Sequence, residues 1–198
     1  MHSIELLLDG PADAAVRAQW AALTDAGLPS QADHASSSNA PHVTLLARRR
    51  IDDTTDPALT ALFDGALPAA VELGAPLVFG GGRGHVLVRS IVATRELLDL
   101  HAAVHEIVGG DQDVPHSSPG HWVPHVTLAS RLDAEGVGRA LAALGAFADE
   151  EAREASEDAA APAAPGGAPA ADHAAGTTRL VAGRRWDPSR RTIVVLGR

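Results

Sequence analysis

The distribution of apolar and polar positions along the chain predicts strands that alternate with helices. Short runs rich in apolar residues and bounded by turn residues are typical of strands, and longer stretches with apolar residues three or four apart are typical of helices. Strands are expected at Ser3–Asp9, His42–Arg49, Ala70–Phe79, His85–Val92, Pro124–Ser130, Arg179–Gly183 and Arg191–Leu196. Helices are expected at Ala12–Ala26, Pro57–Leu67, Arg95–Val108 and Ala134–Phe147.

The predicted elements occur twice in a similar order. Each half runs through a strand, a helix, a loop, a strand that begins His-Val-Thr, and a further helix. Strands separated by helices, with hairpins late in each half, predict an α+β duplication built of mostly antiparallel sheets. A chain of 198 residues is long enough for one domain of two small lobes, so a single domain is expected over residues 1–198. The order of strands in the sheet does not follow from this pattern.

One segment interrupts the pattern of strands and helices. Residues 148–176 are acidic at first and then repeat Ala, Pro and Gly, with almost no large apolar side chain. A segment of this kind has little apolar surface to bury and so little to offset the entropy of ordering. We therefore expect a disordered insertion at 148–176.

The composition and the first residues bear on where in the cell the protein is expected. Apolar residues make up 45% of the chain, but no uninterrupted apolar run approaches the ~20 residues of a membrane span. The first residues, Met1–Glu5, lack the basic patch and apolar stretch of a secretory signal. We expect a cytoplasmic protein that does not contact the membrane, and a monomer.

The residue types that are missing exclude several enzyme classes. The chain has no cysteine, and all 16 of its basic residues are arginine. Disulfides, thiolate metal sites, lysyl-nucleotide intermediates and P-loop lysine contacts are therefore excluded. Much of the formal charge of −9 falls in the 148–176 segment, which holds seven acidic residues and one arginine. The rest of the chain is compatible with a small phosphorylated substrate but shows no broad basic face for duplex DNA.

The pentapeptide Pro-His-Val-Thr-Leu occurs twice, beginning at Pro41 and at Pro124. Side chains two apart on a strand share a face, so His42 lies beside Thr44 and His125 beside Thr127. One imidazole can accept a proton while a second, cationic one donates a proton near neutral pH. Threonine hydroxyls can donate hydrogen bonds to phosphate oxygens. The repeat therefore predicts a two-histidine acid/base site for phosphodiester chemistry that needs neither a metal nor a cofactor.

Two arginines extend the repeat if both strands remain regular. Arg48 and Arg131 each fall six residues after their histidine, on the same face by a count of two. Either arginine could contact phosphate and offset developing charge, or could be a solvated charge at a strand or helix end.

The repeated His-x-Thr pattern, the spacing between its copies and the hairpin of Phe79 to Ser90 resemble the 2H phosphoesterase superfamily. That superfamily includes bacterial 2′-5′ RNA ligase-like proteins and cyclic nucleotide phosphodiesterases. The resemblance implies a bilobal fold with pseudo-twofold symmetry, in which helices flank the sheets around a central groove. It also implies hydrolysis of 2′,3′-cyclic phosphates of nucleotides or RNA ends, with His42 and His125 as acid and base in undetermined order. Thr44 and Thr127 would then hold the phosphate, and the reverse reaction would be 2′-5′ RNA ligation.

Two other readings of the same residues stay open. A non-catalytic module could capture a phosphorylated nucleotide or RNA end in the same groove. A metal hydrolase could instead use His116, His121 and His125.

Several further residues have both a structural and a functional interpretation. Trp122 could stack on a nucleobase or pack in the core, and Phe79 is expected in the core. His101 and His105 have the spacing of helical metal ligands, but surface or core positions are expected because no Glu follows His101. Gly80–Gly84 is expected to form a flexible hairpin rather than a phosphate loop.

Overall fold

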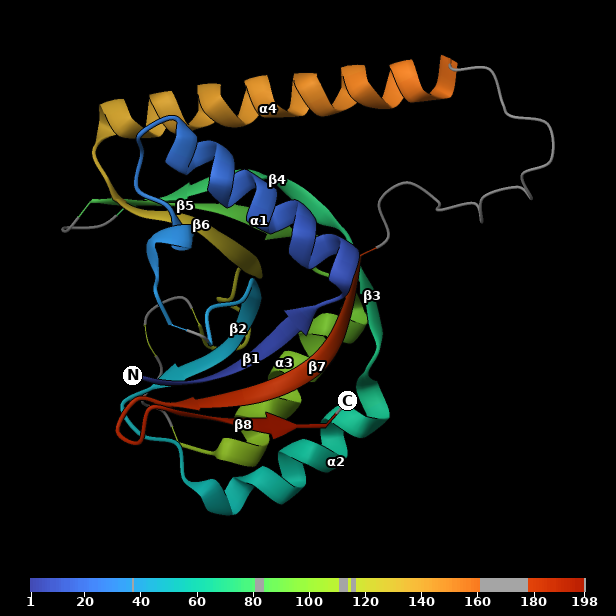
Figure 1. Cartoon of the computed structure of the whole chain (residues 1–198). Coiled ribbons are helices and arrows are strands. Elements are labelled where there is room, and N and C mark those ends of the chain that lie inside the picture. The colour runs from blue at the N-terminus through green and yellow to red at the C-terminus, as the bar shows by residue number, and fades with distance from the viewer. Residues whose placement is uncertain (37, 81–83, 111–113, 115–116, 161–177, 198) are drawn as a thin grey trace.

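The computed structural model describes residues 1–197 except 37, 81–83, 111–113, 115–116 and 161–177 (Figure 1). Its strands are β1 (His2–Leu8), β2 (His42–Arg48), β3 (Ala69–Val71), β4 (Leu73–Phe79), β5 (His85–Ile91), β6 (His125–Leu132), β7 (Thr178–Asp187) and β8 (Thr192–Leu196). Its α-helices are α1 (Gly10–Asp25), α2 (Asp56–Ala66), α3 (Arg95–Val108) and α4 (Ala134–Ala160).

All eight strands belong to one antiparallel sheet. Its order is β3-β7-β1-β2-β6-β5-β4, and β8 pairs with β7. The strands that carry the repeated pentapeptide, β2 and β6, are neighbours in the middle of this order, where Val43 pairs with Val126. The two edge strands β3 and β4 are separated only by Glu72, so the chain joins one end of the sheet to the other. The motifs are thus brought together at the centre of a curved sheet (Figure 1).

Local signals explain where the helices begin and end. Asp9 caps α1 by accepting a hydrogen bond from the backbone N–H of Ala12, and Pro11 follows within the first turn. Thr94 caps α3 in the same way, and α3 ends at Gly109, whose φ of 63° favours glycine.

The helices form two pairs on different parts of the sheet (Figure 1). Helices α1 and α4 pack against each other and on β6, and α4 also contacts β5. Helices α2 and α3 contact each other, α2 packs on β7 and β8, and α3 packs on β2. Each helix contributes fully or nearly fully buried apolar side chains to the core, among them Val16, Phe63, Leu97 and Leu144. This burial supplies the main stabilising term and fixes the positions of β2 and β6.

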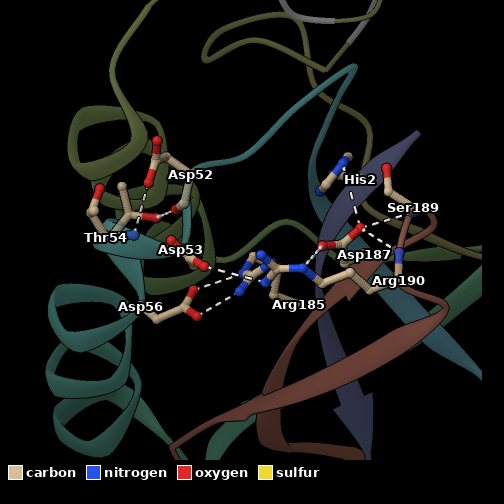
Figure 2. A network of polar contacts seen from close by, with 10 residues as sticks. His2, Asp52, Asp53, Thr54, Asp56, Arg185, Asp187, Ser189 and Arg190 are labelled. Atoms are coloured by element: carbon tan, nitrogen blue, oxygen red, sulfur yellow. Dashed lines mark hydrogen bonds and ion pairs between the residues drawn. The ribbon is translucent and has the colours of Figure 1, made fainter.

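A buried ion pair connects α2 to β7 (Figure 2). Arg185 is 2% exposed, and its Nε and Nη2 donate to the two carboxylate oxygens of Asp56 at 2.7 and 2.6 Å. At the end of the same strand, the Asp187 carboxylate accepts the backbone N–H groups of Ser189 and Arg190 and so shapes the turn into β8. Arg185 pairs in register with the core residue Ile4. Its side chain therefore lies on the face of the sheet that α2 covers, and not on the face of His42 and Thr44.

The α+β class with a mostly antiparallel sheet is confirmed, whereas the bilobal duplication stays a prediction. The elements agree with those expected except in three places. The strand expected at Arg179–Gly183 is longer, because β7 continues to Asp187 while it pairs with β1 and β8. The expected strand Ala70–Phe79 is two strands, because β3 pairs with β7 and β4 pairs with β5. The expected disorder from residue 148 is wrong for its first part, because α4 continues to Ala160. The rest of that segment, 161–176, lies outside the described residues. Within the described chain, none of the helices has the length and apolar character needed to cross a bilayer.

Candidate active site

The two motifs lie on adjacent strands with their histidines and threonines on one face. Continued by one residue from the Val43–Val126 pair, the antiparallel register sets His42 opposite Thr127 and Thr44 opposite His125. All four of these side chains are half-buried, whereas the two valines are buried on the opposite face. His42 and His125 are therefore diagonal neighbours across the two strands, and such neighbours are about 7–8 Å apart, so both imidazoles lie within reach of one phosphate.

A β-bulge follows the threonine in both motifs. Glu5 pairs with Thr44 but the preceding Ile4 pairs with Leu46, which leaves Leu45 as an extra residue. On the other side, Val88 pairs with Thr127 and Leu87 with Ala129, which leaves Leu128 extra. A bulge shifts the alternation of side chains by one position, so the residues after it change face.

The bulge explains why Arg48 does not reach the motif face. Its side chain is 5% exposed, and its guanidinium donates to the carbonyl oxygens of Gly109 and, at 3.3 Å, Gly110. Arg48 thus anchors the loop after α3, and the expectation of a phosphate contact is wrong for it. Arg131 lies within a second register shift of β6, between Ala129 and Leu132, is exposed, and has a φ of 63°. The regular strand that placed Arg131 beside His125 is therefore absent as well.

Backbone carbonyls hold both imidazoles in one tautomer. Nδ1 of His42 lies 2.7 Å from the carbonyl oxygen of Ala40, and Nδ1 of His125 lies 2.7 Å from that of Val123. A carbonyl only accepts, so each Nδ1 carries the proton that it donates. In a neutral ring the Nε2 atom is then a free acceptor, and in a cationic ring it holds the labile proton. His42 and His125 therefore have the same tautomer and the same distance from Nδ1 to a carbonyl oxygen.

Two tryptophans donate hydrogen bonds to the backbone of the motif strands. Nε1 of Trp20, on α1, donates to the carbonyl oxygen of Thr127 at 3.0 Å. Nε1 of Trp122 donates to the carbonyl oxygen of Thr44 at 3.1 Å, and its ring stacks on His101 at 4.0 Å. Trp122 therefore supports the first motif, and the stacked imidazole takes a face that a nucleobase would need. Sequence reasoning gave Trp20 no functional role, although it makes the matching bond to the second motif.

The aromatic side chain beside His125 is Phe79, from the edge strand β4. Its ring meets the imidazole edge-on, with centroids 4.9 Å apart and planes at 66°. Phe79 was expected in the core, but it is half-buried and forms part of the wall around His125. Burial lowers the pKa of His125, the hydrogen bond to Val123 opposes this shift, and the charge of His42 lowers the pKa further. His125 is thereby favoured in its neutral form near pH 7.

A buried carboxylate lies beside the other histidine. Oε1 of Glu5 is 3.7 Å from Nε2 of His42, and its Oε2 accepts from Nε of Arg184 at 2.7 Å. Burial alone would raise the pKa of Glu5, but the charges of His42 and Arg184 and the hydrogen bonds from Ser3 and Arg184 hold it below its usual value. Glu5 is therefore anionic at neutral pH. The matching register position on β5, opposite Thr127, holds Val88, so only the first motif has this carboxylate.

Two further histidines, His101 and His105, have structural positions. Both are buried, in agreement with the core position that was one of the two expected. Their Nε2 atoms form hydrogen bonds with the carbonyl oxygens of Ser117 and Leu45, respectively. The second contact holds the bulge residue of the first motif. His121 is exposed, and His116 lies outside the described residues. Among the residues that the structure describes, no three His, Asp or Glu side chains are grouped to hold a metal ion.

Comparison with known proteins agrees with this geometry. Residues 11–161 match the family model of the 2′-5′ RNA ligase superfamily, and this range contains both pentapeptides. No curated protein matches the sequence. Because the family model covers well over half of the chain, including both motif strands and their supporting helices, the chain belongs to the 2′-5′ RNA ligase superfamily of the 2H phosphoesterases.

Proposed function

We propose that the protein is a metal-independent phosphodiesterase that hydrolyses 2′,3′-cyclic phosphates of nucleotides or RNA ends. The observation that carries the proposal is the matched pair of imidazoles on adjacent strands, each with Nδ1 bound to a carbonyl and Nε2 left for proton transfer. In-line displacement at phosphorus needs a base for the incoming nucleophile and an acid for the leaving oxygen.

The surroundings of the two rings favour one assignment of roles. His125 has a lowered pKa and no carboxylate at the matched register position, which suits the base. His42 lies at ion-pair distance from the buried Glu5 carboxylate, and an anion at this distance stabilises the cationic imidazole that acts as acid. The hydroxyls of Thr44 and Thr127 would donate to the non-bridging oxygens of the phosphate.

The proposed reaction balances without a cofactor. His125 Nε2 takes a proton from water as its oxygen attacks phosphorus, and the bond from phosphorus to the ribose 3′ oxygen breaks. His42 Nε2 gives its proton to that oxygen, which leaves a 2′-phosphate and a 3′-hydroxyl. Solvent then restores the two protonation states. If the 5′-hydroxyl of a second RNA end replaced water, the same steps would form a 2′-5′ bond without ATP.

Turnover in the presence of a chelator tests this proposal. Wild type, His42→Ala and His125→Ala are assayed with 2′,3′-cyclic mononucleotides and cyclic-ended oligonucleotides in EDTA. Each substitution should lower kcat by at least ~100-fold, the usual contribution of one proton-transfer group. His121→Ala is the matched control, because this exposed histidine belongs to the metal-site alternative and should be dispensable. Binding of a cyclic phosphate without hydrolysis between pH 5 and 8 would support a binding module instead.

A further inference from the structure

A groove extends from His42 toward the turn between β7 and β8. A cavity of about 210 Å³ is lined by His42 and Glu5, and a larger one of about 730 Å³ reaches Pro188 and Arg191 at the turn. Both cavities are lined by Ser36, Ser38, Trp186 and Ile193. Because they share these residues, they form one continuous groove, which we call the Trp186 groove. Its larger part falls in the size range of small-molecule sites, about 300–1,000 Å³.

The register of the sheet places Trp186 on the same face as the proposed acid. Trp186 is opposite Ser3 on β1 and opposite Ile193 on β8. Ser3 and Glu5 are two apart on β1, and Glu5 pairs with Thr44, whose face is also that of His42. Trp186 is half-buried, so part of its ring is available to the groove. This distinguishes Trp186 from Trp20, which is 3% exposed and packed in the core.

If the proposed function holds, the chemistry of the reaction determines which part of the substrate lies on the His42 side of the phosphorus atom. The acid protonates the 3′ oxygen, which belongs to the ribose of the nucleoside that carries the cyclic phosphate. The nucleoside must therefore lie on the His42 side of phosphorus, and the attacking water on the His125 side. The Trp186 groove begins at His42 and leads away from it, which is the position that the nucleoside requires.

We infer that the Trp186 groove is a nucleoside subsite, in which the base stacks on Trp186 against Ile193. An indole offers a stacking face to any base, so the subsite would tolerate different bases, and the serine hydroxyls could donate or accept hydrogen bonds at the base edge. Arg191 is exposed at the far end and would bind the 5′-phosphate of the same nucleotide. The groove thus selects a nucleotide or an RNA end over a cyclic phosphate that has no base.

Binding of stable product analogues tests the subsite independently of turnover. Adenosine 2′-phosphate, adenosine 2′,5′-bisphosphate and ribose 2-phosphate are titrated into wild type by calorimetry. Wild type should bind adenosine 2′-phosphate about five- to 150-fold more tightly than ribose 2-phosphate, which corresponds to the stacking of one base. Trp186→Ala should abolish this difference, and Trp186→Phe should retain most of it. Arg191→Gln should weaken only the bisphosphate.

Val195→Ala is the matched control, because Val195 is an exposed β8 residue outside the lining of both cavities. Equal affinity for adenosine 2′-phosphate and ribose 2-phosphate in wild type would overturn the subsite, and so would an unchanged preference in Trp186→Ala. If Trp186→Ala does not fold, the subsite is still tested by the ratio of the two affinities in wild type and in Trp186→Phe. Base-dependent binding without hydrolysis would leave the subsite standing and reject the proposed function. Hydrolysis with no dependence on the base would support the proposed function and reject the subsite.

Discussion

Replacing Glu5 with Gln tests the assignment of acid and base most directly. The substitution keeps the shape of the side chain and removes its charge, 3.7 Å from Nε2 of His42. If His42 is the acid, it must be protonated before the reaction, and activity falls at high pH as that proton is lost. The carboxylate stabilises the protonated ring, so its removal should move the alkaline limb of the pH profile of kcat/KM to lower pH.

The size of this shift follows from the charges around Glu5. Two unit charges 4 Å apart interact by about 4 kcal/mol at an effective dielectric constant of about 20. Two effects reduce this value, since the His42 side chain is 34% exposed and Arg184 lies 2.7 Å from the other carboxylate oxygen. We therefore expect a remaining effect of about 1–2 kcal/mol, or roughly one pH unit.

The assay is kcat/KM for a 2′,3′-cyclic mononucleotide from pH 5 to 9 in EDTA. Arg184→Gln is the companion variant, because it removes the cation that competes for Glu5 and should move the alkaline limb to higher pH. Each substitution breaks a buried ion pair and costs about 3–5 kcal/mol of stability, so folding must be confirmed at the assay temperature. A shift of the acidic limb in Glu5→Gln would reverse the two roles, and an unchanged profile would refute the electrostatic argument.

Further substitutions test Phe79, which lies beside His125, and the buried ion pair of Arg185 with Asp56. Burial lowers the pKa of His125, and a base acts above its pKa, so wild-type activity should persist further into acid than an ordinary imidazole allows. Phe79→Ala should hydrate the ring and move the acidic limb up by as much as about one pH unit, and an unmoved limb would exclude Phe79 as the cause. Arg185→Met should lower the free energy of unfolding in urea by about 3–5 kcal/mol, because it leaves Asp56 without its buried partner. The double variant with Asp56→Leu should recover most of this loss, and kcat should be unchanged wherever the variants are folded.

The sequence predicted the arrangement of the two motifs better than that of their surroundings, because the face on which a strand residue lies follows from local spacing. His42 and Thr44 share a face whatever the order of strands, and so do His125 and Thr127. That β2 and β6 are neighbours could not be read from local spacing, since pairing depends on contacts between residues 83 apart. The repeat itself was the signal for this proximity, because the proposed chemistry requires both copies of the motif at a single phosphate.

The error at Arg48 arose from counting across a bulge. A count by two assumes regular pleating, and the extra residue at Leu45 turns the following side chains to the other face. One signal was available, because Leu45 and Leu46 are consecutive apolar residues and both are fully buried. The extension of α4 has a different cause. The absence of large apolar residues predicted disorder, but the Ala and Glu residues of 148–160 have high helix propensity and continue a helix that has already begun.

The roles proposed for the two histidines differ because of residues outside the repeated pentapeptide. Both motifs have the same five residues, the same carbonyl contact at Nδ1 and the same bulge after threonine, so none of these features distinguishes an acid from a base. The difference comes from the strand that pairs with each motif, which places a carboxylate opposite Thr44 and a valine opposite Thr127. A catalytic pair needs unlike partners at one phosphate. In the proposed mechanism, identical motifs thus serve opposite steps of one reaction because the strands beside them differ, and the residue opposite the threonine sets which imidazole donates its proton.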